Sequence, residues 1–425
     1  MQTFLHKLNV IFTDSAIRKR ILFVIGAIAM FRLLAAVPIP GVDHLMLEQF
    51  FSNNQFLGLL NLFSGGGLSN LSIVMLGVGP FITASIIMQL MTVMSPQMKS
   101  LYNEEGEAGR AKFTQYSRLL SLPLAILQGF GFLKLLESQG VLTGLSPFEF
   151  AVNVVIVVAG AVLLMWVGEL VTEYGIGNGV SIIIFSGILA GLPATVSQLA
   201  FNFDASQLPL YIGFGLLTLG VIYSVVVMTE AERVVPITHA KQSRGNSMIM
   251  TKGNESYLPL RLNQAGVIPI IFALSILLFP QMILNILSAM GYSWVAAASA
   301  AVTAFTENEI WYGMAYFLLV FFFTFFYTAV TFDPDAISKN LQRNGAFIPG
   351  IRPGEHTSEY LGNLITRLTL VGALFLALVA VLPIGLQMAT GIAALAIGGT
   401  AILIVVSVVL DLIRRLDAQI SLREY

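Results

Sequence analysis

Residue types that carry enzyme chemistry are sparse in this chain of 425 residues. It contains no cysteine, which excludes disulfides, iron–sulfur clusters and thiolate zinc sites. Neither an H-E-x-x-H metalloprotease motif nor a G-x-S-x-G nucleophile motif occurs. The four histidines fall outside the apolar segments, at His6, His44, His239 and His356. The sequence therefore predicts a protein that is not an enzyme and that needs no metal or cofactor.

Two further functions, phosphate binding and ion-coupled transport, have little support in the sequence. The glycine-rich segment Gly175-Ile-Gly-Asn-Gly179 lacks the lysine and the preceding strand of a phosphate loop, so a break between two helices is the better interpretation. Ion-coupled transporters keep ionisable groups near the middle of a membrane helix. Here Glu169, Glu230 and Asp411 lie at the ends of their apolar segments. Only Arg32 lies deep in one, and a structural role is favoured over a functional one.

The composition indicates a membrane protein. Hydrophobic residues make up 56% of the chain and charged residues 11%, against roughly 25% charged in a soluble domain. A soluble enzyme is therefore excluded. Basic residues (Arg18, Lys19 and Arg20) precede a first apolar run that is too long for a signal peptide and has no small-residue cleavage site. We expect this run to be an anchor that is kept.

A bilayer core about 30 Å thick requires roughly 20 apolar residues in each crossing helix. Ten segments meet this requirement, at about 20–37, 72–94, 116–136, 150–171, 177–197, 208–229, 263–286, 309–331, 367–388 and 391–413. The sequence thus predicts an all-α polytopic membrane protein with ten transmembrane helices and both termini on one side.

The distribution of basic residues predicts which side that is. All but two of the 22 lysines and arginines fall on one side, the exceptions being Arg32 and Lys134. Because cytoplasmic loops carry this excess, both termini are predicted to be cytoplasmic. Two long loops, about 231–262 and 332–366, lie on the same side. Loops of about 30 residues carry a function more often than short turns do, and the alternative is that their charges only set the topology.

Two spans share the pattern G-V-x-P-x-I, at Gly77–Ile82 and Gly266–Ile271. They lie five spans apart, an odd number, so the copies cross the membrane in opposite directions. Such inverted repeats are typical of transport proteins with a pathway between the halves. A weaker echo joins the fifth and tenth spans. The repeat therefore predicts two halves, 1–200 with spans 1–5 and 201–425 with spans 6–10. The alternative is that the similarity arose by chance.

The repeat-related segments carry branched aliphatic side chains where a transporter would carry polar ones: Val78, Ile82, Val180, Ile184, Ile271 and Ile404. Such residues usually pack against helices or lipid. The alternative is a hydrophobic constriction that gates by excluding water. The segment before the second span, Phe56–Leu71, is too short to cross the membrane and contains three consecutive glycines. It is therefore either a re-entrant piece buried in protein or an interfacial loop.

Long motifs over nearly the whole chain resemble those of the SecY family, the channel-forming subunits of the bacterial protein translocase. The motifs that carry the resemblance are Pro38–Gly41, Phe63–Leu68, Pro80–Ile87, Glu105–Arg110, Trp166–Glu169, Gly175–Gly179, Leu258–Leu260, Asn263–Pro269, Phe347–Glu355 and Ile397–Thr400.

The resemblance implies a clamshell of two five-helix halves around an hourglass pore, with the six aliphatic residues as the ring at its waist. It implies a plug half-helix at about 56–68, containing Leu60, Phe63, Gly65, Gly66 and Gly67. It also implies a lateral gate between the second and seventh spans. Asn263 matches the family's gate position best, and the weaker candidates are Thr83, Ser85 and Gln89.

The resemblance further implies partners: the small subunits SecE and SecG, the SecA ATPase or a ribosome, precursor proteins with signal sequences, and lipid. Arg352 matches the arginine that the family needs for motor-driven export, and Arg244 and Lys241 are further docking candidates. The chain departs from the family at Gly245-Asn246-Ser247, where many relatives have two arginines. Its tail, ending at Tyr425, is also short, so contacts assigned to the family's tail are not carried over.

The leading hypothesis is therefore a channel in the plasma membrane. It would pass unfolded, signal-bearing polypeptides across the membrane and release transmembrane segments sideways into lipid, driven by a partner motor or ribosome. The runner-up is an ion-coupled small-molecule transporter, but this sequence lacks the intramembrane carboxylate that such a transporter would use. A third hypothesis is a pore-less scaffold or an insertase devoted to few substrates.

Overall fold

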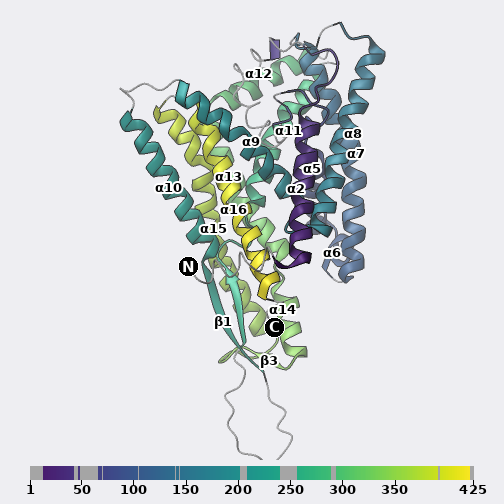
Figure 1. The fold of residues 1–425 in the computed structure, drawn as a ribbon. Coiled ribbons are helices and arrows are strands. Elements are labelled where there is room, and N and C mark those ends of the chain that lie inside the picture. Colours follow the sequence, from purple (N-terminus) through teal and green to yellow (C-terminus); the bar gives the residue numbers. More distant parts are fainter. Residues whose placement is uncertain are drawn as a thin grey trace, which may run out of the picture.

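The computed structural model describes residues 13–42, 46–47, 66–68, 70–103, 105–138, 140–142, 144–201, 208–239, 256–288, 293–390 and 393–421. Helices make up most of these residues (Figure 1). The first half of the chain forms α2 (Ser15–Ala35), α5 (Gly79–Met94), α6 (Pro96–Asn103), α7 (Gly106–Ser138), α8 (Pro147–Tyr174) and α9 (Gly179–Phe201). The second half forms α10 (Leu208–Glu230), α11 (Ile268–Ser288), α12 (Ser293–Glu307), α13 (Glu309–Thr331), α14 (Pro334–Arg343), α15 (Glu355–Thr390) and α16 (Ala393–Ser421).

A helix forms within each of the ten predicted segments, because in lipid only a helix or a closed barrel satisfies every backbone polar group. Within the described ranges, four helical stretches are long and apolar enough to cross a membrane: Gly106–Glu137, Pro147–Tyr174, Glu309–Arg343 and Glu355–Met388. A fifth results if α5 and α6, bent by 114° at their junction, count as one span. The mostly helical class with several apolar helices is thus confirmed, and the number ten stays a prediction.

The repeated G-V-x-P pattern marks the start of a helix in both copies. Gly77 and Gly266 have left-handed backbone conformations, with φ of 58° and 62°. Pro80 and Pro269 are each the second residue of the helix that follows, where a missing N–H costs nothing. The expectation that the helix of the second span begins at about residue 72 was therefore wrong. Residues 71–78 form turns, and α5 begins at Gly79.

The two long loops together form a small sheet that the all-α prediction did not contain. Strand β1 (Glu232–His239) pairs antiparallel with β2 (Ser256–Arg261) and with β3 (Ala346–Phe347), in the order β2-β1-β3. Because side chains alternate along a strand, Val235 on β1 and Leu260 on β2 turn into a core with Ile348 and the start of α15. The described parts of the two loops thus form one folded unit.

The ends and sides of the molecule are distinct in Figure 1. Helices α7 and α8 lie on one side, α10, α13 and α15 on the other, and α2, α5 and α9 between them. The strands, α14 and the end of α16 lie at one end of the helical body, and α12 lies at the opposite end. The two halves meet where α11 contacts α7 and α5 and where α16 contacts α9.

Candidate functional site

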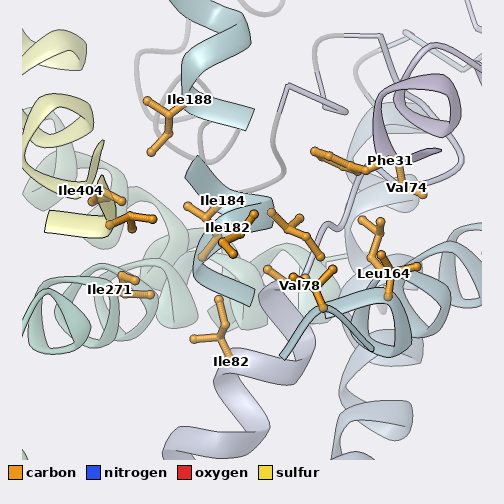
Figure 2. Close-up of a cluster of buried hydrophobic side chains, with 14 of the residues drawn as sticks. Phe31, Val74, Val78, Ile82, Leu164, Ile182, Ile184, Ile188, Ile271 and Ile404 are labelled. Atoms are coloured by element: carbon orange, nitrogen blue, oxygen red, sulfur yellow. The ribbon is translucent and has the colours of Figure 1, made fainter. Parts of the chain in front are cut away.

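The six aliphatic residues selected from the sequence lie in one buried cluster, hereafter the aliphatic cluster (Figure 2). They come from four helices of both halves. Val78 is the N-cap of α5 and Ile82 lies in its first turn, Val180 and Ile184 are on α9, Ile271 is on α11, and Ile404 is on α16. Five of them are at most 9% exposed, and Val180 packs against them partly buried. Their role as a pore ring stays a prediction.

Further apolar side chains pack around the aliphatic cluster. Phe31 from α2, Val74 from the turns before α5, and Leu164 from α8 extend it, together with Ile182 and Ile188 of α9 (Figure 2). None of its buried members carries a charge or a hydrogen-bonding side chain. Water gains no hydrogen bonds in such a constriction, which is the physical basis of a hydrophobic gate.

The Gly175–Gly179 segment positions α9 and thereby two of the six selected side chains, Val180 and Ile184. Gly177 is left-handed at φ 90°, and Asn178 caps α9 by accepting the N–H of Val180 at 3.0 Å. A Cβ on Gly179 would lie 1.9 Å from the carbonyl oxygen of Gly168 on α8, so only glycine fits. The segment is a tight turn between two helices, as expected, and its glycines serve close packing.

The four lateral-gate candidates lie at two helices in contact, α5 and α11. Thr83 donates to the carbonyl of Gly79 at 3.0 Å, and the Nδ2 of Asn263 donates to the carbonyl of Gly266 at 3.2 Å, across the turn that starts α11. The buried oxygens Gln89 Oε1 and Asn263 Oδ1 have no hydrogen-bond partner within the described residues. Ser85 is half-buried on α5. Gate function stays a prediction for all four.

The described part of the plug candidate is buried in protein. Leu60, Phe63 and Gly65 lie outside the described residues. Gly67 accepts the N–H of Ser72 at 2.8 Å. The side chain of Leu68, next in the chain, is fully buried in a cluster with residues of α7 and α8. Gly66, left-handed at φ 80°, lies so that a Cβ there would be 3.6 Å from the guanidinium of Arg32.

Arg32 bridges two helices beside the aliphatic cluster. Its guanidinium donates to the backbone carbonyl of Ser186 on α9 and lies 5.2 Å from the ring centroid of Phe31. A backbone carbonyl and an aromatic face are partners that make a partly buried arginine tolerable. Of the two interpretations left open by the sequence, this geometry fits the structural one.

Of the docking candidates, Arg352 is exposed in the loop between β3 and α15. Lys241 and Arg244 lie outside the described residues. The described residues bring no three histidine, aspartate or glutamate side chains together.

Sequence reasoning missed two ion pairs that tie helix ends within each half. Arg118 on α7 donates to Glu169 on α8 at 2.5 Å, and Arg414 on α16 donates to Glu230 on α10 at 2.9 Å. Sequence reasoning placed both acids at the ends of their apolar segments and indicated no partner for either. The sequence did contain a signal for these pairs, because each acid has an arginine on the predicted same side of the membrane.

Comparison of the sequence with known proteins points to one family. The family model described as SecY matches residues 72–413. The protein translocase subunit SecY of Mycobacterium tuberculosis is 39% identical over 430 residues, 96% of each chain. That of Pseudomonas aeruginosa is 40% identical over 411 residues, 96% of this chain and 91% of the relative.

Solved structures agree in fold. A structure of a protein-conducting channel has a TM-score of 0.64 at 18% identity and covers 95% of this chain and 92% of its own. Sec61 in a canine ribosome–channel complex has a TM-score of 0.62 at 18% identity, with the same coverage. By the family model and by relatives that match over nearly the full length, this chain belongs to the SecY family.

Proposed function

We propose that this chain is the central subunit of a protein-conducting channel in the plasma membrane. It passes unfolded, signal-bearing polypeptides across the membrane and releases transmembrane segments sideways into lipid. The observation that carries the proposal is the aliphatic cluster, in which four helices from both halves bring branched side chains to one place. The names of the relatives, protein translocase subunit SecY, support the same function.

The cluster suits a channel for unrelated polypeptides. Branched aliphatic side chains exclude water and ions when they close on one another. They make no hydrogen bonds, so they do not select particular sequences. A segment of about 20 apolar residues gains free energy by leaving sideways into the bilayer, whereas a polar segment does not. Sorting between secretion and insertion then follows from the substrate's own hydropathy.

The proposed architecture has ten spans in two inverted halves, 1–200 and 201–425, with both termini cytoplasmic and the plug at about 56–68. It is supported by a helix within each predicted segment and by the matching backbone at Gly77 and Gly266. The lateral gate is proposed between α5 and α11, lined by Thr83, Ser85, Gln89 and Asn263. Two of these residues carry buried side-chain oxygens without a described partner, which suits a seam that separates and recloses.

The driving energy comes from a partner, because the sequence carries no nucleotide-binding loop. We assign this role to SecA or a ribosome, with SecE and SecG as small subunits. Ribosome docking is supported by the fold likeness to Sec61 and Ssh1 complexes solved on ribosomes. Arg352, exposed on the folded loop unit, is the proposed motor contact. The chain itself is a channel and not an enzyme.

A reconstituted transport assay tests this function. Vesicles containing the chain, its SecE partner and SecA receive a signal-bearing precursor, and its protection from added protease is measured with and without ATP. We expect ATP-dependent protection that is lost with Arg352→Glu and kept with Arg343→Glu, a charge reversal at an exposed arginine at the end of α14. Absence of protection with all partners bound and active would contradict motor-driven export.

A further inference from the structure

The loop that carries Arg352 has a fixed backbone. It runs from the end of β3 to the start of α15 and turns at two left-handed glycines, Gly350 at φ 83° and Gly354 at φ 99°. Between them, the N–H of Ile351 donates to the carbonyl of Ile348 at 3.1 Å. Ile348 is itself buried in the core beneath the sheet. The backbone on either side of Arg352 is thus held at defined points.

Two buried hydroxyl groups hydrogen-bond to the backbone of the same loop. The Oγ1 of Thr357 donates to the backbone carbonyl of Arg352 itself at 2.9 Å. The Oγ of Ser338, on α14, donates to the carbonyl of Gly354 at 2.5 Å. Thr357 is 1% exposed and Ser338 is 3% exposed, so water does not compete for these bonds. Each hydroxyl therefore fixes the position of one peptide group next to the arginine side chain.

Helix α14, which supplies Ser338, is anchored at its own start. The side chain of Asp333 caps it by accepting the N–H groups of Asp335 and Ala336 at 3.0 and 3.1 Å. The carboxylate of Asp335 in turn accepts the hydroxyl of Ser358 on α15. Because α14 and α15 also pack against each other, Ser338 acts from a rigid support.

The charge of Arg352 stays available on this support. Its side chain is exposed, and no acidic side chain among the described residues forms an ion pair with it. A guanidinium presents a planar fork of donors that matches a carboxylate. Holding such a group on an ordered loop lowers the entropy that is lost when a partner binds.

We infer that Ser338 and Thr357 are positioning residues, which hold Arg352 in place for a carboxylate-bearing surface of the translocation motor. This inference rests on the proposed docking function of Arg352. Neither hydroxyl touches the motor; each acts through the loop backbone. Loss of either is expected to weaken motor binding about threefold to tenfold, the usual value of one hydrogen bond.

The absence of cysteine from the chain allows a direct measurement of positioning. Arg352→Cys, labelled with a nitroxide and assembled with cysteine-free partner subunits, reports the mobility of the loop by electron paramagnetic resonance. Thr357→Val and Ser338→Ala remove the hydroxyls, whereas Thr357→Ser and Ser338→Thr keep them. Thr366→Val is the matched control, because its hydroxyl donates only to Gly362 within α15. We expect a more mobile label only in the first two variants.

Motor binding is measured in parallel on the same complexes with Arg352 present. Thr357→Val and Ser338→Ala are expected to raise the Kd for SecA, and the hydroxyl-keeping variants and Thr366→Val are expected to leave it unchanged. In the background of Arg352→Ala, Thr357→Val is expected to add nothing, because a residue that acts through Arg352 has no effect without it.

The outcomes separate the two claims. An unchanged label spectrum in Thr357→Val and Ser338→Ala overturns the positioning role whatever the motor does. A mobile label with unchanged motor affinity also overturns it, since the loop's order would then serve no docking. If Arg352→Ala itself leaves motor binding unchanged, the docking function assigned to Arg352 fails, and the spectra still decide whether the hydroxyls order the loop.

Discussion

Ile82 and Ile271 occupy equivalent positions in two copies of one backbone motif and meet in the same aliphatic cluster. Each lies five residues after a left-handed glycine and two residues after the proline that opens its helix. Each donates its N–H to the carbonyl of the valine four residues earlier, at 3.0 Å for Ile82 and 3.4 Å for Ile271. The helices α5 and α11 thus both begin at the cluster, so each half of the chain supplies the same element to it.

This equivalence predicts that a polar group at either position opens the closed channel to ions. Ile82→Asn and Ile271→Asn each place an amide where burial without partners costs about 1–3 kcal/mol, so water enters to satisfy it. We expect an ion leak raised by about tenfold or more in each variant. The measurement is conductance across planar bilayers without motor or substrate. Ile82→Leu, which keeps the side chain apolar, is expected to stay tight, and a leak equal to that of Ile82→Asn would contradict the ring.

The turn before α9 predicts a glycine that cannot be replaced. Gly179→Ala would place a Cβ 1.9 Å from the carbonyl oxygen of Gly168, and backbone cannot yield as a flexible side chain can. We expect a loss of about 1–3 kcal/mol in stability, typical of overpacking. The readout is thermal unfolding of the purified complex in detergent. Gly191→Ala in the same helix meets nothing within 4 Å and is expected to leave the midpoint unchanged or slightly raised.

The ion pair between Arg118 and Glu169 predicts a measurable coupling between α7 and α8. The side chain of Glu169 is only 17% exposed, so solvent screens this pair incompletely. A double-mutant cycle with Arg118→Ala and Glu169→Ala is expected to give a coupling free energy near the upper end of about 0.2–1 kcal/mol. The pair of Lys112 and Glu105, at 3.5 Å and about half exposed on both sides, is the control and is expected to give less. Equal coupling in both pairs would contradict the argument from burial.

The sequence was informative where one local rule determined the structure. The six aliphatic residues could be selected because their segments repeat a pattern, and the structure gathers all six. The start of α5 was placed too early because Leu71–Val78 is as apolar as a helix, and only the pairing of Gly77 with Pro80 marks the true boundary.

The sheet was missed because its strands contain prolines, which argue against strands in sequence reasoning. The structure accommodates both prolines. Pro259 lies on the edge strand β2, and Pro236 lies on β1 beyond the two residues that pair with β3. Helix α12 was missed because its 15 residues are fewer than the roughly 20 that a span requires. Contacts between residues far apart in the sequence, such as that of Arg32 with Ser186, have no signal in sequence periodicity.

The register of β1 with β3 predicts that the two long loops can be joined by a single engineered disulfide. Thr238 and Phe347 are direct partners in the antiparallel pair, and the hydroxyl of Thr238 donates to the carbonyl of Phe347 at 3.3 Å. Opposite residues in such a pair have Cα atoms about 4.5–5.5 Å apart, within reach of a disulfide. Because the chain has no cysteine of its own, Thr238→Cys with Phe347→Cys gives one defined pair.

Mild oxidation of this double variant is expected to cross-link it nearly completely, measured as a gel-mobility shift after cleavage between the two loops by an inserted protease site. The control is Pro236→Cys with Phe347→Cys, two residues out of register, which is expected to cross-link poorly because the Cα atoms are too far apart. If the two loops work as one unit during transport, the cross-linked channel keeps its motor-driven activity. Loss of activity on oxidation, restored by reduction, would show instead that the loops separate in the working cycle.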